Sequence, residues 1–94
     1  MRSSAKSVAT FIKAKRAEKN LSQVEFSKLI FPQHTSYQFL SNIERGKCQL
    51  PPRAINKLSE ITGTPNDLIV DLMIEDYKAA IISEVANESK SFTK

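Results

Sequence analysis

One stretch constrains the fold of this chain more than any other: residues 21–46, with the sequence LSQVEFSKLIFPQHTSYQFLSNIERG. Ser22, followed three residues later by Glu25, is the pattern of a reciprocal capping box and predicts a helix over residues 23–30. Pro32 disfavours a helical conformation at the residue before it, and the polar residues after it predict a turn. Two short helices joined by a turn are therefore expected.

The second helix of this pair is expected over residues 37–44, with Gly46 as a stop signal after its last turn. Leu40 and Ile43, three residues apart, form its inward face. A short helix fits the major groove of duplex DNA, where exposed amide side chains pair with base edges, above all with adenine. The polar side chains predicted to lie on the outer face are Gln38, Ser41 and Asn42.

Two of these pieces, LSQ at 21–23 and IERG at 43–46, with KAKR at 13–16 before them, resemble a known family. They are similar to the helix-turn-helix domain of the lambdoid phage repressors and Cro, an XRE-like family of transcriptional regulators. The resemblance covers roughly residues 8–69 and implies an all-α, five-helix lambda-repressor-like DNA-binding domain. The turn IFPQHTS is longer than the family's turn and places Phe31 where the family has Gly.

The resemblance also implies roles for single residues. An ion pair between Arg16 and Glu44 would hold the second helix of the pair against the first helix of the domain. Gln23 would contact a DNA phosphate, although a solvated polar side chain is the alternative for this residue. The implied base-reading residues are Tyr37, Gln38, Ser41 and Asn42, and the expected phosphate-contacting residues are Gln23, Arg45, Lys47 and Arg53.

Charge is distributed unevenly along the chain. Residues 1–57 carry 11 Lys and Arg against 3 acids, a balance of +8, and residues 58–94 carry 3 Lys against 7 acids, a balance of −4, which together give the net charge of +4. A basic half that contains the helix pair suits the neutralisation of DNA phosphates, and the acidic half is expected to face away from DNA. The alternative is a basic surface that only keeps the chain in solution.

The segments on both sides of the pair predict further helices. Ser7 is a capping candidate for a helix over residues 8–19. Pro52 suits the first turn of a fourth helix. The predicted core positions are Val8, Phe11 and Ile12 in the first helix, Phe26, Leu29 and Ile30 in the second, and Ile55, Leu58 and Ile61 in the fourth.

The C-terminal part is predicted to form one long helix that begins near Thr64-Pro65-Asn66-Asp67 and continues to about residue 86. Leu68 and Leu72 lie on one side of it, and a row of five apolar residues lies on nearly the opposite side. One monomer buries only one such face well, so the row is predicted to be the seam of a homodimer. The seam residues are Val70, Ile74, Tyr77, Ile81 and Val85.

Three segments are therefore expected. Residues 7–63 form the DNA-binding domain, and residues 64–87 form a helix that closes the core and dimerises. Residues 88–94 form a disordered polar tail.

Several classes of protein lack their sequence signatures in this chain. An enzyme is not expected, because there is no glycine-rich phosphate loop and no nucleophile with a paired base. His34 and Cys48 are too few for a zinc site, and no metal or other cofactor is expected. The apolar runs are too short to cross a bilayer, the first residues do not resemble a signal peptide, and the single Cys48 fits a reducing compartment. A cytoplasmic protein without a membrane partner is predicted.

The predicted function is sequence-specific binding of double-stranded DNA by a homodimeric transcriptional regulator, with residues 37–44 in the major groove. Two alternatives stay open. One is an antitoxin that regulates its own gene through the helix pair and holds a toxin on another surface. The other is an adaptor whose helix pair binds a protein and no DNA.

Overall fold

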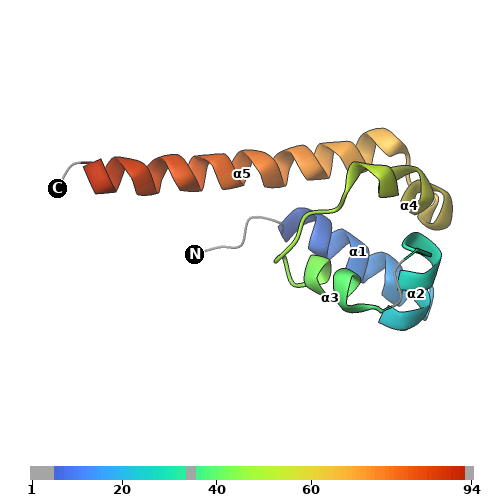
Figure 1. Cartoon of the computed structure of the whole chain (residues 1–94). Helices are drawn as coiled ribbons and strands as arrows, with labels where there is room; N and C mark the ends of the chain where they lie inside the picture. Colours follow the sequence, from blue (N-terminus) through green and yellow to red (C-terminus); the bar gives the residue numbers. More distant parts are fainter. Residues whose placement is uncertain (1–5, 34–35, 93–94) are drawn as a thin grey trace.

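The computed structural model describes residues 6–33 and 36–92, and every secondary-structure element in that part of the chain is helical. The predicted all-α class is therefore confirmed. Helices α1 to α4 form a small globule with the first half of α5, and the rest of α5 projects from it (Figure 1). The elements are α1 (Lys6–Glu18), α2 (Gln23–Ile30), α3 (Gln38–Glu44), the 3-10 helix η1 (Pro52–Ala54), α4 (Ile55–Thr62) and α5 (Asn66–Phe92).

Helix α2 begins and ends where the sequence predicts, because the capping box forms. The Glu25 amide donates a hydrogen bond to the Ser22 hydroxyl (3.1 Å), and the Ser22 amide donates to a Glu25 carboxylate oxygen (2.9 Å). After the turn, the Ser36 hydroxyl accepts a hydrogen bond from the Gln38 amide (3.1 Å). Helix α3 begins at Gln38, one residue after the predicted start, and Tyr37 occupies its N-cap position.

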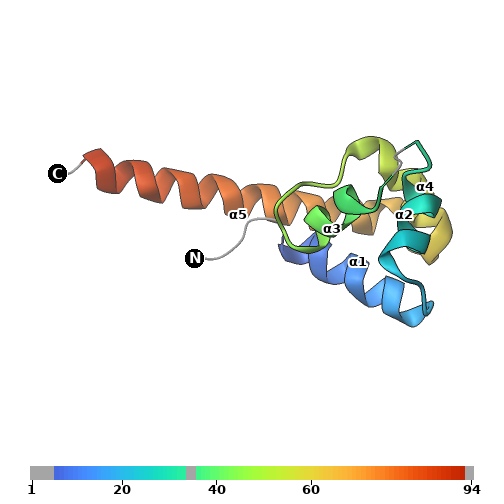
Figure 2. The ribbon, with the colours of Figure 1, turned by 60° about the horizontal axis from the view of Figure 1, so that its bottom comes forward.

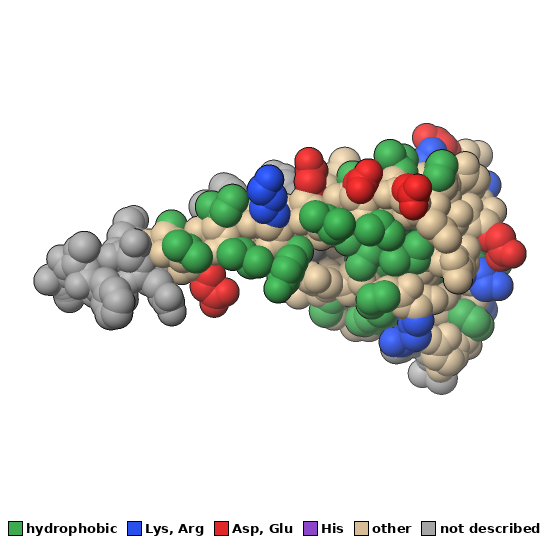
Figure 3. All heavy atoms as spheres, turned by 90° about the horizontal axis from the view of Figure 1, so that it is seen from above, with side chains coloured by type: hydrophobic (Ala, Val, Ile, Leu, Met, Phe, Trp, Pro, Cys, Tyr) green, Lys and Arg blue, Asp and Glu red, His purple; other side chains and the backbone are tan. Residues whose placement is uncertain are grey.

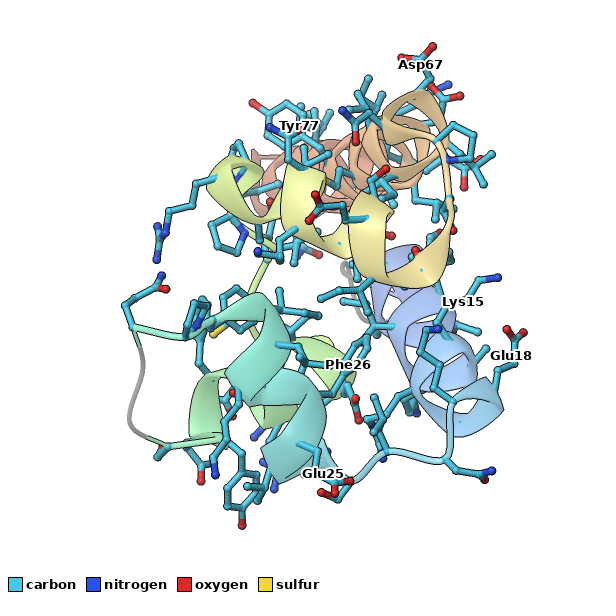
Figure 4. All side chains as sticks on the ribbon, turned by 90° about the vertical axis from the view of Figure 1, so that its right-hand side faces the viewer. Lys15, Glu18, Glu25, Phe26, Asp67 and Tyr77 are labelled. Carbon is cyan, nitrogen blue, oxygen red and sulfur yellow. The ribbon has the colours of Figure 1, made fainter. Side chains whose placement is uncertain are left out.

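The hydrophobic core lies between α1, α2, α3 and α4 and is closed by α5. Phe26 points into the middle of these helices (Figure 4). Leu29 was predicted to join it but is 45% exposed, because Phe26 and Ile30 define the inward face of α2 and Leu29 lies about 100° round the helix from Ile30. The fully buried large side chains are Ile12, Phe26, Phe31, Leu40, Ile43, Leu58 and Ile69.

The start of α1 is held by α5. The Asp76 carboxylate accepts hydrogen bonds from the Ser7 amide (2.9 Å) and the Val8 amide (3.1 Å). Ser7 was predicted to cap this helix, but α1 begins at Lys6, so Ser7 lies in the first turn and its hydroxyl donates to Glu75 (3.3 Å). A buried carboxylate from α5 thus satisfies two of the free amides of α1 and complements the positive end of its dipole.

The globular half of α5 packs against α1 and α4. Its inward face contains Ile69, which is fully buried, together with Leu72 and Asp76. Leu68 was predicted to share a side with Leu72 but is 49% exposed. The buried face of α5 is centred on Ile69 and Asp76, so Leu72 lies at its edge and Leu68 lies beyond that edge.

Beyond Ala80, α5 leaves the globule, and every side chain over residues 81–87 is exposed (Figures 1 and 2). The predicted helix end near residue 86 and the disordered tail from residue 88 are corrected: α5 continues to Phe92. No Gly or Pro lies in this stretch to end the helix. The last part of the predicted tail, residues 93–94, lies outside the described residues. In the described part of the chain, no helix has the length and apolar content needed to cross a membrane.

Candidate nucleic-acid interface

Helix α3 has 7 residues, too few for an isolated helix to be stable in water. Its position therefore depends on tertiary contacts. Leu40 and Ile43 are fully buried, as predicted, and α3 packs against both α1 and α2. It lies on the side of the globule away from α5 (Figure 1), and α1 packs against both α3 and α5.

The predicted ion pair between Arg16 and Glu44 is present and has two hydrogen bonds. Arg16 Nε donates to Glu44 Oε2 (2.8 Å), and Arg16 Nη2 donates to Glu44 Oε1 (3.1 Å). The Glu44 side chain is 3% exposed, and its hydrogen bonds raise the pKa of Arg16 further above its ordinary, already strongly basic value. Arg16 therefore stays charged at every physiological pH.

Gln23 completes this arrangement. Its side-chain amide donates to Glu44 Oε1 (2.9 Å), and Arg16 Nη1 donates to the Leu21 carbonyl (3.0 Å). Glu44 stands at the C-terminal end of α3, where the helix dipole disfavours an acid, and three donors compensate for that position. We call Arg16, Gln23 and Glu44 the α3 anchor. The anchor gives Gln23 a structural role that the sequence did not predict, and its phosphate contact stays a prediction.

The outer face of α3 is narrower than predicted. Gln38 is exposed, Tyr37 is 43% exposed and Asn42 is half-buried. Ser41 was predicted to read bases, but it is only 7% exposed. Because α3 lies against both α1 and α2, its flanks are covered as well as its inward face, and Ser41 lies on such a flank. Only the side that carries Gln38 and Asn42 remains open.

A tight turn ends α3 and carries two of the predicted phosphate contacts. Gly46 has φ +76°, a conformation that a residue with a side chain adopts only with strain. The Lys47 amide donates to the Asn42 carbonyl (2.9 Å), which closes the end of the helix. Arg45 and Lys47, on either side of Gly46, are both exposed. Arg53 is also exposed and lies in η1.

The long turn between α2 and α3 is tied to the core by two aromatic rings that the sequence did not single out for this purpose. Phe31 is buried, and its ring lies edge-on to that of Phe39, with 5.0 Å between the centroids. Phe31 has φ −124°, so this position has no need of Gly. The Phe31 amide also donates to the Ser27 carbonyl (2.7 Å).

The predicted dimer seam lies on the surface of α5. Ile74, Tyr77, Ile81 and Val85 are 56%, 60%, 44% and 58% exposed, and Val70 is half-buried. Tyr77 stands on the outside of the globule next to α4 (Figure 4). As the sequence predicts, the core of one monomer does not bury this row. Whether a second copy covers it remains a prediction.

Metal-binding chemistry finds little support in the described residues. They contain no group of three or more His, Cys, Asp and Glu side chains that could hold a metal ion. Cys48 is free and half-buried in the loop after α3. His34 lies outside the described residues.

Comparison of the chain with protein-family models, with curated proteins and with solved structures gave no match. The case for a function therefore depends on the geometry of α3 and its surroundings.

Proposed function

We propose that this chain is a homodimeric, lambda-repressor-like transcriptional regulator of the XRE-like family that binds double-stranded DNA with α3 in the major groove. The observation that carries the proposal is the α3 anchor. A helix too short to be stable alone is held from behind by Arg16, Gln23 and Glu44, while Gln38 on its other side stays exposed. Such an arrangement presents a rigid polar face to a partner without using that face for folding.

Gln38 and Asn42 are the base-reading residues in this proposal, with Tyr37 at the N-terminal end of the same surface. Gln38 and Asn42 are four residues apart, so both lie on one face of α3. An amide side chain makes two hydrogen bonds to adenine in the major groove. Arg45, Lys47 and Arg53 supply the phosphate contacts, which set the affinity but not the sequence preference.

The exposed apolar row of α5 also supports a protein partner. In the antitoxin alternative, this row would hold a toxin while α3 binds DNA. In the adaptor alternative, the chain would bind only protein. These alternatives make different predictions, because binding to DNA phosphates weakens steeply as salt is raised, whereas an adaptor would show no duplex binding at any salt concentration.

The proposal is tested by selecting bound sites from a random duplex pool and then measuring two variants on single-base changes of the selected site. Gln38→Ala should lose about 1–3 kcal/mol of discrimination at one base pair and leave non-specific binding nearly unchanged. Lys47→Ala should weaken all sequences alike and reduce the log-affinity against log-salt slope by roughly 0.9 per half-site. Equal weakening of every site by Gln38→Ala would remove it from the base-reading set.

A further inference from the structure

An apolar groove of about 420 Å³ lies between η1, α4 and α5. One wall belongs to the α5 row, and the other comes from the segment that follows α3. Seen from above, apolar side chains cover this face of the globule and continue along the projecting part of α5 (Figure 3). The walls are formed by Gln49, Pro52 and Ile55 on one side and by Val70, Met73, Ile74 and Tyr77 on the other.

The projecting part of α5 has the complementary property. Ile81 and Val85, the two residues of the row in this part, are 44% and 58% exposed. A helical segment of this length gains little stability from its own hydrogen bonds, so contacts with another surface must supply the rest. Each apolar side chain removed from water contributes roughly 25 cal/mol per Å² of buried area.

We propose that the groove receives the projecting part of α5 from a second copy of this chain, in an antiparallel and reciprocal arrangement. The inference rests on the homodimer in the proposed function and requires no DNA. In a two-fold dimer the same surface serves both chains. In the antiparallel arrangement the row must therefore match itself when one copy is reversed. With the axis beside Tyr77, Val70 lies opposite the partner's Val85, and Ile74 lies opposite the partner's Ile81.

The lengths of the two segments agree with this pairing. The groove uses α5 over residues 70–77, and the segment over residues 78–85 carries the exposed part of the row. Each segment spans about 12 Å at the helical rise. An antiparallel pair therefore places one projecting segment over one groove on each side of the axis. A parallel pair would place the two projecting segments against each other and leave both grooves open.

Charge favours the same direction. Glu84 follows Tyr77 by seven residues, so it lies on the groove side of the row. In an antiparallel two-fold pair, the groove side of one α5 and the groove side of the partner's α5 face the same way. The partner's Glu84 therefore lies next to the wall formed by η1 and α4. Arg53, next to Pro52 of that wall, is exposed, and Glu84 is exposed as well.

Disulfide cross-linking between single cysteines tests the direction of pairing in the full-length chain, with Cys48→Ser as background. Two proteins carry Val70→Cys and Val85→Cys respectively, and they are oxidised alone and as an equal mixture. A disulfide requires Cα atoms within about 7 Å of each other. In the antiparallel pair, equal positions lie roughly 22 Å apart, which is 15 residues of helical rise. Cross-linked dimer should therefore form in the mixture and in neither protein alone.

Two controls keep the result interpretable. Ala79→Cys is exposed on another face of α5 and should form no rapid cross-link. If circular dichroism shows that Val70→Cys, a half-buried position, unfolds the chain, the pair Ile74→Cys and Ile81→Cys replaces it with the same expectation.

Rapid cross-linking of Val85→Cys alone would overturn the antiparallel pairing, because equal positions meet only in a parallel pair. A monomer by light scattering at tens of micromolar, roughly the range of weak specific association, would also overturn it. The proposed function can fail separately. If the mixture cross-links but the protein binds no duplex, the antiparallel pairing is supported and DNA binding is not. If the chain binds duplex DNA but stays monomeric, the antiparallel pairing and the homodimer are rejected, and DNA binding is supported.

Discussion

Helix α3 and the projecting part of α5 are both segments that would not be stable as isolated helices, yet they relate to the globule in opposite ways. Helix α3 is held by fully buried Leu40 and Ile43 and by the α3 anchor. The α5 segment over residues 81–87 has no buried side chain. Folding of one chain therefore accounts for the position of α3, whereas the apolar surface of distal α5 is left for another molecule. The fold thus separates the surface that it stabilises from the surface that it leaves for association.

The largest expected effect comes from breaking the anchor. Arg16→Ala leaves the Glu44 carboxylate buried without its charged partner, which typically costs about 3–5 kcal/mol of stability. Urea unfolding followed by circular dichroism measures the loss. The control is Lys15→Ala on the same helix. Lys15 is half-buried and contacts the exposed Glu18 (3.6 Å) and the face of the Phe11 ring (5.9 Å), and these contacts together should be worth about 1 kcal/mol or less. Equal, small losses of stability for both variants would show that the α3 anchor does not hold α3 in place.

An intermediate effect is expected at the junction of α1 and α5. Asp76→Ala removes the acceptor of the Ser7 and Val8 amides, and hydrogen bonds to a charged group contribute about 1.5–3 kcal/mol. Amide hydrogen exchange should become faster at the start of α1, and the free energy of unfolding should fall. Glu75→Ala, which removes only an exposed contact with Ser7 (3.3 Å), should stay within about 0.5 kcal/mol of the parent. Unchanged exchange in Asp76→Ala would show that α5 does not cap α1.

The smallest effect on the single chain is expected in the exposed apolar row of α5. Ile74→Asp combined with Ile81→Asp should change the unfolding free energy at sub-micromolar concentration by no more than about 0.5 kcal/mol, because both side chains are exposed. The same variant should lose the rise of Tm with protein concentration that a dimer shows.

The matched control for this variant is Leu68→Asp combined with Ile82→Asp. It adds the same charges to exposed apolar positions outside the row and should keep the concentration dependence. A large loss of stability in dilute Ile74→Asp/Ile81→Asp would instead place the row in the core of one chain.

The sequence was sufficient for some features that depend on residues within one or two helical turns. The bounds of α2 follow from Ser22 and Glu25, which satisfy each other's backbone amides across three residues. The inward direction of Leu40 and Ile43 follows from their spacing. The ion pair between Arg16 and Glu44 came from the family resemblance, since no local pattern links residues so far apart in the chain.

Only the tertiary structure decided which faces are covered and which donors meet which acceptors. Periodicity groups residues on one face of a helix, but it does not say which neighbouring helix covers that face or how far the cover extends. Leu29 and Leu68 are therefore exposed and Ser41 is buried, against prediction. Asp76 caps α1 and Gln23 binds Glu44 because packing brings distant segments together, and burial makes an unsatisfied amide or carboxylate too costly to leave without a partner.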